Sequence, residues 1–131
     1  MSRVRAIDLD SFIATEGLSA GVSQVTIDTN GHDPLVLEGL RHTIARQAVG
    51  LLEFEVSSMG FWSPKHAERR LLSHTTDWLH AAGYECFWQT HSALVPLSGA
   101  CWQPQFDKPP RWANVLCAHR PRVVARLYYL A

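Results

Sequence analysis

The sequence has 131 residues, which is enough for one domain with a buried core but not for two. Hydrophobic residues make up 47% and charged residues 18%, which excludes a disordered chain. Twelve basic and twelve acidic side chains cancel, so the basic excess of a nucleic-acid-binding protein is missing. No apolar run approaches the roughly 20 residues that span a bilayer, and the N-terminus does not read as a signal peptide, which favours a cytoplasmic protein.

The first part of the chain predicts a short helix followed by a strand. Residues 4–7 are a weak strand candidate. Asp8 or Asp10 can cap a short helix that Gly17 ends. Residues 23–28 are rich in β-branched side chains and predict a strand.

A turn and a long helix are expected next. The dipeptide Asn30–Gly31 suits a turn with positive φ. Asp33 precedes Pro34, and this order predicts a helix start with Asp33 as the N-cap. Apolar residues at helical spacing extend the predicted helix over residues 33–47, with one face buried.

The second half continues the alternation of strands and helices, which favours a layered α/β fold. Further strands are expected at 51–56, 84–89, 94–97 and 113–118. In the first of these, Leu52, Phe54 and Val56 share one face, and Glu53 and Glu55 share the other. A second helix is expected to start at Ser63–Pro64 and end at Gly83. The loop 98–111 is expected to be pinned by Trp102, Phe106 and Trp112, although one or two tryptophans among Trp62, Trp88, Trp102 and Trp112 could instead form a substrate platform. Pro121 is expected to start a last short helix.

Cysteines and histidines give no metal or redox motif. The three cysteines, Cys86, Cys101 and Cys117, are odd in number and lack the short spacing of a zinc site, which favours free thiols in a reducing compartment. The histidines show no HExxH-like spacing, so no metal site is expected.

Several short sequence words occur in the order of one known family. The segment VTIDTNGHDPLVLEGL resembles the signature of FkbM-type S-adenosylmethionine-dependent methyltransferases, in which a strand ends in a K-I-D-x-E-G-like turn and enters a helix. AIDLDSFI, LLEFEV, LHAAGYECF and ANVLC resemble further elements of that family. The resemblance covers residues 4–118.

The resemblance implies a partial class I methyltransferase (Rossmann-like) sheet, in which parallel strands are followed by an antiparallel last strand and helices lie on the faces. Residues 1–131 would form the C-terminal part of that domain. The glycine-rich turn that holds the cofactor has no counterpart here, since no D-x-G-x-G-like sequence occurs. Thr26 and Asn30 also replace the lysine and the glutamate of the family's signature.

The candidate catalytic residues are Asp28, His32 and Glu55. Asp28 ends a strand at the edge where open α/β sheets bind ligands, although a turn-capping role is equally consistent. His32 could act as a general base or face solvent in the turn. Glu55 is expected to serve acid–base chemistry or acceptor binding, because a carboxylate on a central strand is costly to bury unless it is used or paired.

Asn30 and Trp62 are the candidate substrate-binding residues. Turn geometry alone also explains Asn30, and core packing also explains Trp62. No cofactor-binding residue can be named.

The resemblance implies methyl transfer from S-adenosylmethionine to a hydroxyl oxygen of a sugar or secondary metabolite. The alternative is a non-catalytic remnant that binds a partner, and a small unrelated α/β module is a third hypothesis. Expected partners are a small-molecule or glycan acceptor and, through an exposed sheet edge, a second copy of the chain. Neither nucleic acid nor a membrane span is expected.

Overall fold

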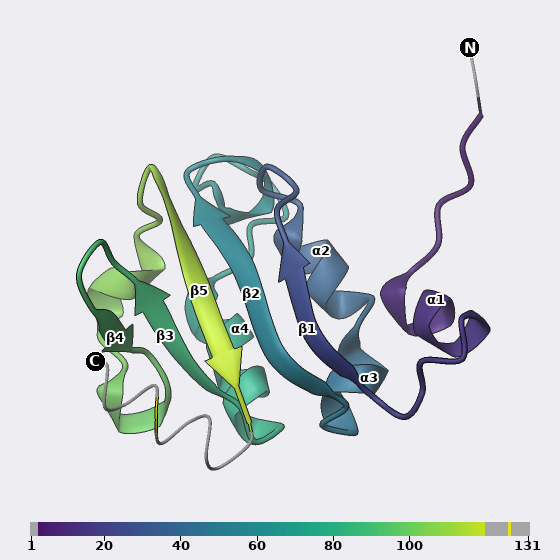
Figure 1. The fold of residues 1–131 in the computed structure, drawn as a ribbon. Helices are drawn as coiled ribbons and strands as arrows, with labels where there is room; N and C mark the ends of the chain where they lie inside the picture. The colour runs from purple at the N-terminus through teal and green to yellow at the C-terminus, as the bar shows by residue number, and fades with distance from the viewer. Residues whose placement is uncertain (1–2, 120–125, 127–131) are drawn as a thin grey trace.

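A computed structural model describes residues 3–119 and residue 126, and these form a five-stranded mixed sheet with helices (Figure 1). The strands are β1 (Val22–Ile27), β2 (Val49–Ser57), β3 (Glu85–Gln89), β4 (Leu94–Pro96) and β5 (Trp112–Ala118). The α-helices are α1 (Leu9–Thr15), α2 (Asp33–Glu38), α3 (Arg41–Ala45) and α4 (Leu72–Ala81). Short 3-10 turns occur at Gly60–Trp62, Gly99–Cys101 and Pro104–Asp107.

The strand order in the sheet is β1-β2-β5-β3-β4. β1 and β2 are parallel neighbours, and the connection through α2 and α3 passes behind the sheet as a right-handed crossover (Figure 1). β5 is antiparallel to both β2 and β3, so β1, β2 and β3 run in one direction. These features confirm the expected single sheet, its parallel first pair and its antiparallel last strand.

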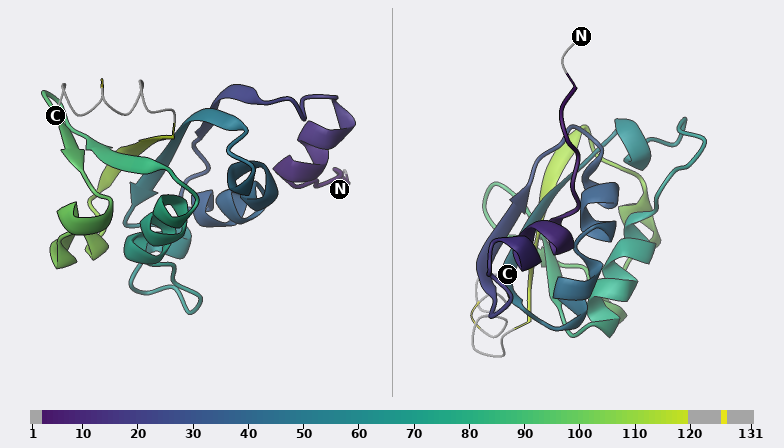
Figure 2. Two further views of the ribbon diagram at one scale, coloured as in Figure 1. Left: turned by 90° about the horizontal axis from the view of Figure 1, so that it is seen from below. Right: turned by 90° about the vertical axis from the view of Figure 1, so that its right-hand side faces the viewer.

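One face of the sheet carries the main core. Leu52, Phe54 and Val56 of β2 are almost completely buried, as the alternation in the sequence predicts. They pack with apolar side chains of α2, α3 and α4, which all lie on this face (Figure 2). Helices were expected on the faces of the sheet. Among the described residues, α2, α3 and α4 cover one face.

The opposite face is apolar at one end and polar at the other. Leu116 and Phe87, with Ala118, form a smaller buried cluster against Leu51 and Leu94. Towards the carboxyl end of β2 the same face carries Glu53 and Glu55, because side chains alternate along a strand. This polar end holds the candidate site.

The long helix expected over residues 33–47 is wrong in one respect, since it is split into α2 and α3. α2 ends at Gly39, and α3 begins after Leu40. The carboxylate of Asp10 accepts hydrogen bonds from the backbone N–H groups of His42 (2.8 Å) and Thr43 (2.8 Å). A side chain from α1 therefore caps a second helix start, which local periodicity cannot reveal.

The expected N-cap roles of the aspartates are partly confirmed. Asp8 caps α1, accepting a hydrogen bond from the Ser11 N–H at 2.7 Å. The prediction for Asp33 is wrong, because His32 occupies the N-cap position and Asp33 is the first residue of α2. Asp33 instead directs its carboxylate towards β2.

The helix expected from Ser63–Pro64 begins only at Leu72. Its first turn is capped by the loop after β4: Asp107 accepts hydrogen bonds from the Ser73 N–H (2.9 Å) and the Ser73 hydroxyl (2.7 Å). The start signal at Ser63 forms only a local turn, in which its hydroxyl accepts from the Lys65 N–H.

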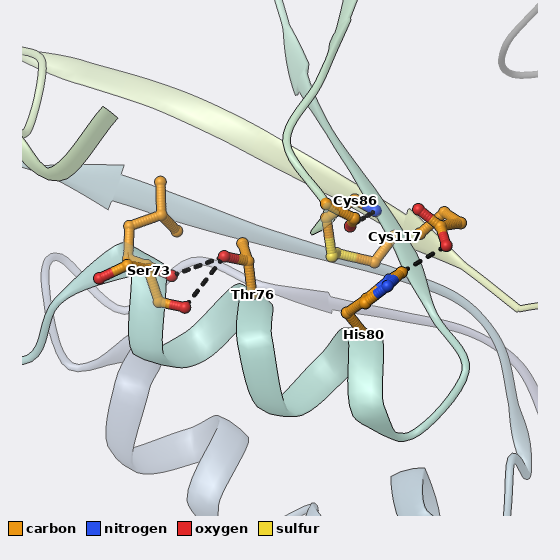
Figure 3. Close-up of a disulfide and its surroundings, with 8 residues drawn as sticks. Ser73, Thr76, His80, Cys86 and Cys117 are labelled. Atoms are coloured by element: carbon orange, nitrogen blue, oxygen red, sulfur yellow. Dashed lines mark hydrogen bonds and ion pairs between the residues drawn. A yellow bond between two sulfur atoms is a disulfide. The ribbon is translucent and has the colours of Figure 1, made fainter. Parts of the chain in front are cut away.

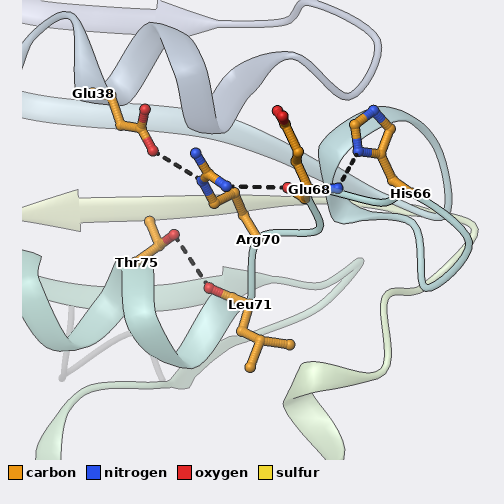
Figure 4. A network of polar contacts seen from close by, with 6 residues as sticks. All are labelled: Glu38, His66, Glu68, Arg70, Leu71 and Thr75. Atoms are coloured by element: carbon orange, nitrogen blue, oxygen red, sulfur yellow. Dashed lines mark hydrogen bonds and ion pairs between the residues drawn. The ribbon is translucent and has the colours of Figure 1, made fainter.

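A polar network holds the irregular segment before α4 (Figure 4). The Arg70 guanidinium forms an ion pair with Glu38 of α2 at 3.0 Å and donates to the Glu68 carbonyl oxygen. The Glu68 N–H in turn donates to His66 Nδ1. These contacts order the segment without helical hydrogen bonds.

Two further expectations concern the ends of the chain. Residues 4–7 form no strand, and Val4 is 90% exposed. The helix expected after Pro121 lies outside the described residues, of which Arg126 alone belongs to that region and is helical. None of the described helices has the length and apolar character needed to cross a bilayer.

The expectation of three free thiols is wrong. Cys86 of β3 and Cys117 of β5 are cross-strand partners and form a disulfide, whereas Cys101 is free and exposed (Figure 3). The pair lies beside the C-terminal end of α4, where His80 pairs with Glu85 at 3.1 Å. Stable disulfides are rare in reducing compartments, so this pair weighs against the cytoplasmic expectation.

Candidate functional site

The candidate site lies at the edge of the sheet where β1 and β2 end. Two turns follow these strands and touch each other through their backbones. Gly31 has φ 91°, and a Cβ atom there would lie 2.6 Å from the Met59 carbonyl oxygen. The Phe61 N–H also donates to the Gly31 carbonyl oxygen at 2.8 Å. The two turns therefore form one continuous wall, and glycine at position 31 permits it.

An open pocket of about 580 Å³ lies against this wall. Its lining residues are Asn30, Glu55, Ser58, Met59, Arg111 and Trp112. A second pocket of about 360 Å³ is lined by Gln89, Thr90, His91, Trp112, Ala113 and Asn114. Trp112 lines both pockets and is 66% exposed, so the two pockets adjoin at this side chain and form one groove.

Polar side chains from three strands form a row along this groove. Glu55 of β2 and Gln89 of β3 are both register partners of Asn114 in β5. Partners in antiparallel strands place their side chains on the same face. The Asn114 amide also donates to Glu53 Oε1 at 3.1 Å, which fixes its orientation. The row therefore presents a carboxylate and two amides side by side.

Glu55 has a raised pKa. Burial is the main cause, and the negative charges of Asp28 and Asp33 act in the same direction. The Ser57 hydroxyl acts in the opposite direction, with a smaller effect. A carboxylate with a raised pKa holds a proton more readily than an ordinary glutamate, so Glu55 is suited to accept a proton from a bound hydroxyl group.

Asp33 supports the backbone of β2 at Glu55. Its fully buried carboxylate accepts a hydrogen bond from the Glu55 N–H at 3.1 Å and another from the Thr29 hydroxyl at 2.9 Å. The first residue of α2 is thereby tied to the strand that carries Glu55. Its role is structural support, with an added electrostatic effect on Glu55.

The structure brings two of the three predicted catalytic residues together. Asp28 is exposed just after β1, and it is close enough for its charge to raise the pKa of Glu55. His32 lies in the same turn but packs edge-on against Phe61, with ring centroids 5.6 Å apart. The imidazole is not among the residues that line either pocket of the groove.

The two predicted substrate-binding residues have different positions. Asn30 lines the larger pocket, and its φ of 53° also gives it a role in the turn. Trp62 is only 2% exposed, stacks on Phe54 with ring centroids 6.2 Å apart, and donates its indole N–H to the Glu55 carbonyl oxygen at 2.9 Å. The Trp62 ring therefore belongs to the core beneath the strand, and it supports Glu55 rather than lining the pocket.

The groove residues that sequence reasoning did not name as site residues include Gln89, Arg111, Trp112 and Asn114. Trp112 was expected to help pin the loop, with a substrate platform left open as the alternative. The register of β5 against β2 is what places these residues near Glu55, and no local pattern in the sequence reveals it.

Among the described residues, no three His, Cys, Asp or Glu side chains are grouped so that they could hold a metal ion. Gly31 and Gly60 follow the two parallel strands at this edge, and the Met59 carbonyl group occupies the space that the missing side chain of Gly31 leaves. The glycine at position 31 therefore makes room for the neighbouring turn.

Compared with models of protein families, with curated proteins and with solved structures, the chain gives no match in any of the three. The family resemblance therefore depends on the sequence words alone. What the groove can bind is therefore inferred from its own side chains, which include a carboxylate, two amides and an exposed aromatic ring.

Proposed function

We propose that this chain forms the acceptor-binding side of an S-adenosylmethionine-dependent O-methyltransferase, in which Glu55 accepts the proton of the acceptor hydroxyl group. The acceptor is a sugar or a secondary metabolite. The observation that carries the proposal is the position of Glu55, a carboxylate of raised pKa in an open polar pocket at the carboxyl edge of parallel strands.

Two further features support the proposal. The sequence words that resemble the FkbM family fall on β1, on the turn before α2, on β2 and on β5. The resemblance implies parallel strands followed by an antiparallel last strand, which is the arrangement of β1, β2 and β5.

The chemistry of the acceptor side follows from the groove. A hydroxyl group bound against Glu55 becomes a stronger nucleophile as its proton passes to the carboxylate. Asn114 and Asn30 can hold neighbouring hydroxyl groups, which fixes the angle at which the oxygen is presented. The glycine-rich cofactor turn that the resemblance implies has no counterpart in this sequence, so we assign the cofactor's cradle to another polypeptide segment.

The cofactor part is tested by calorimetric titration of the purified chain with S-adenosylmethionine. We expect no binding as tight as ~10 μM, because the ligand would lack most of its contacts. A dissociation constant at or below that value would contradict the assignment of the cofactor cradle to another segment.

The acceptor part is tested in a chimera, in which the glycine-rich first half of an FkbM-type methyltransferase is fused before Arg3. Transfer of a labelled methyl group to a panel of hydroxyl compounds is then measured. We expect Glu55→Gln to slow transfer by at least ~100-fold, the usual contribution of a general base. His32→Ala is the matched control from the same edge, and an equal loss in both variants would contradict the role of Glu55.

A second candidate is a non-catalytic, partner-binding fragment. Among the described residues, β1 has a hydrogen-bonded neighbour on one side only, and it carries no charged side chain or proline that would protect its edge. Exposed apolar side chains occur on the segments that flank it, namely Val4, Phe12, Leu18 and Leu35. Sedimentation equilibrium tests this candidate, which predicts dimers that a lysine at the exposed β1 position Thr26 (Thr26→Lys) dissociates.

A further inference from the structure

The groove around Trp112 has the features of a sugar-binding site. Its aromatic ring is exposed in the middle of the groove, whereas the other groove residues are mainly polar. An exposed tryptophan ring offers a flat apolar face that a ligand can cover, with a hydrogen-bond donor at its edge.

A pyranose ring matches this arrangement chemically. One face of the ring is formed by C–H groups and is apolar, so it can stack on an indole ring. The rim carries hydroxyl groups, each of which both donates and accepts hydrogen bonds. Asn114 and Gln89 offer amides with donors and acceptors in one plane, and Glu55 offers two acceptor oxygens.

The same features disfavour a large apolar acceptor. A more apolar pocket of about 240 Å³, lined by Trp88, Phe106 and Pro110 among others, adjoins the groove at Gln89, Thr90 and Ala113, and Glu55 is not part of its wall. A macrocycle or a flat aromatic compound would leave the carboxylate and amides of the groove without partners, which costs binding free energy.

We infer that the acceptor is a sugar whose pyranose ring stacks on Trp112, with one hydroxyl group directed to Glu55 and others to Asn114 and Gln89. The inference rests on the proposed acceptor role of the groove. It does not require the cofactor, because the ring and the polar row both belong to this chain. Sugar binding is therefore measurable without any methyl transfer.

The test is a nuclear magnetic resonance titration of the full chain, labelled with ¹⁵N. The chain has five tryptophans, so its indole N–H signals are few, and the Trp112→Ala variant assigns the one of interest. The probes are the methyl pyranosides of glucose, galactose, mannose and rhamnose, each at up to about 50 mM, with glycerol as the polyol control. We expect at least one pyranoside to shift the Trp112 indole signal with a dissociation constant of ~1–20 mM.

Variants separate stacking from general polarity. Trp112→Ala should weaken binding about 10-fold or more, as followed by the side-chain amide signals of Asn114 and Gln89, while Trp112→Tyr keeps an aromatic face and most of the affinity. Trp102→Ala is the matched control, because Trp102 packs on Phe106 outside the groove and its loss should leave binding unchanged.

Two results overturn the inference: no pyranoside shifts the Trp112 signal, or glycerol shifts it equally. The outcome is separable from that of the proposed function. Sugar binding without methyl transfer in the chimera would contradict the transferase and leave the sugar site standing. Methyl transfer to a hydroxyl compound that is not a sugar, with no sugar binding, would support the transferase and contradict the sugar site.

Discussion

The buried carboxylate of Asp33 accepts a hydrogen bond from the backbone N–H of Glu55, with 3.1 Å between the two atoms. Its other oxygen accepts from the Thr29 hydroxyl at 2.9 Å. A residue at the start of α2 thus fixes both the turn after β1 and the strand that carries the proposed proton acceptor. This relationship gives the first prediction.

Replacing Asp33 by alanine should destabilise the fold by about 2–3 kcal/mol, because the Glu55 N–H and the Thr29 hydroxyl lose a charged acceptor in a buried setting. Asp33→Asn keeps one acceptor oxygen and should lose less. Urea denaturation measures both. Glu38→Ala serves as the control on the same helix, since its surface ion pair with Arg70 contributes no more than about 1 kcal/mol. Equal losses for Asp33→Ala and Glu38→Ala would contradict this account.

The second prediction concerns Glu55 and pH. Burial first, and then the charges of Asp28 and Asp33, raise its pKa above the ordinary value of 4.5. The folded state therefore holds this proton more tightly than the unfolded state. The resulting contribution to stability is fully present below pH 4.5 and is lost as pH rises through the folded-state pKa.

Glu55→Gln removes the loss of stability that ionisation of Glu55 causes at higher pH, because glutamine stays neutral at every pH. The variant should gain stability relative to the natural chain as pH rises from about 4.5 to 7.5, and the gain should level off above the folded-state pKa. Thermal unfolding at a series of pH values measures the difference. Glu68→Gln, which removes an exposed carboxylate, is the matched control. A difference between Glu55→Gln and the natural chain that does not change with pH would show that the pKa of Glu55 is not raised.

The sequence predicted the strands well because each carries its own short-range signal. The alternation of Leu52 and Phe54 with Glu53 and Glu55 is enough to place β2 and to orient both of its faces. The same alternation identified Glu55 as an unusual residue. Asp28 could also be expected near Glu55 once the parallel pair was assumed, whereas Asp33 was expected only as an N-cap.

The helix boundaries were predicted poorly, because they depend on contacts between distant segments. Asp10 caps α3 from 32 and 33 residues away, and Asp107 caps α4 from 34 residues away. For Trp112 the sequence could not decide between loop packing and a substrate platform, for a similar reason. The exposure of Trp112 depends on the register of β5 against β2, which no local pattern in the sequence reveals.

The third prediction concerns the disulfide between Cys86 and Cys117. In the native chain a thiol reagent should detect one group, Cys101, and after reduction and unfolding it should detect all three cysteines. The free energy of unfolding of the double variant Cys86→Ala/Cys117→Ala should fall by about 3–4 kcal/mol, as expected for a bridge between cysteines that are 31 residues apart. Cys101→Ser should leave stability unchanged. Three reactive thiols in the folded chain would contradict the bridge.

The last prediction concerns two glycines that both have positive φ but differ in their surroundings. Gly31 has φ 91° and no room for a side chain, because its Cβ atom would lie 2.6 Å from the Met59 carbonyl oxygen. Gly17 has φ 71° and nothing within 4 Å of the same position. Gly17→Ala should therefore cost only the backbone term of about 1 kcal/mol, and Gly31→Ala about 3 kcal/mol, because a clash with backbone atoms is added.

Gly31→Ala should also change the groove, since Met59 lines the same pocket as Trp112. In the folded fraction, the backbone signals of residues 58–61 should shift and the Trp112 indole signal should move with them. Gly17→Ala should leave all of these signals in place, because Gly17 lies at the end of α1, away from the groove. Equal stability losses for the two variants, or an unchanged Trp112 signal in Gly31→Ala, would show that the two turns do not form one wall.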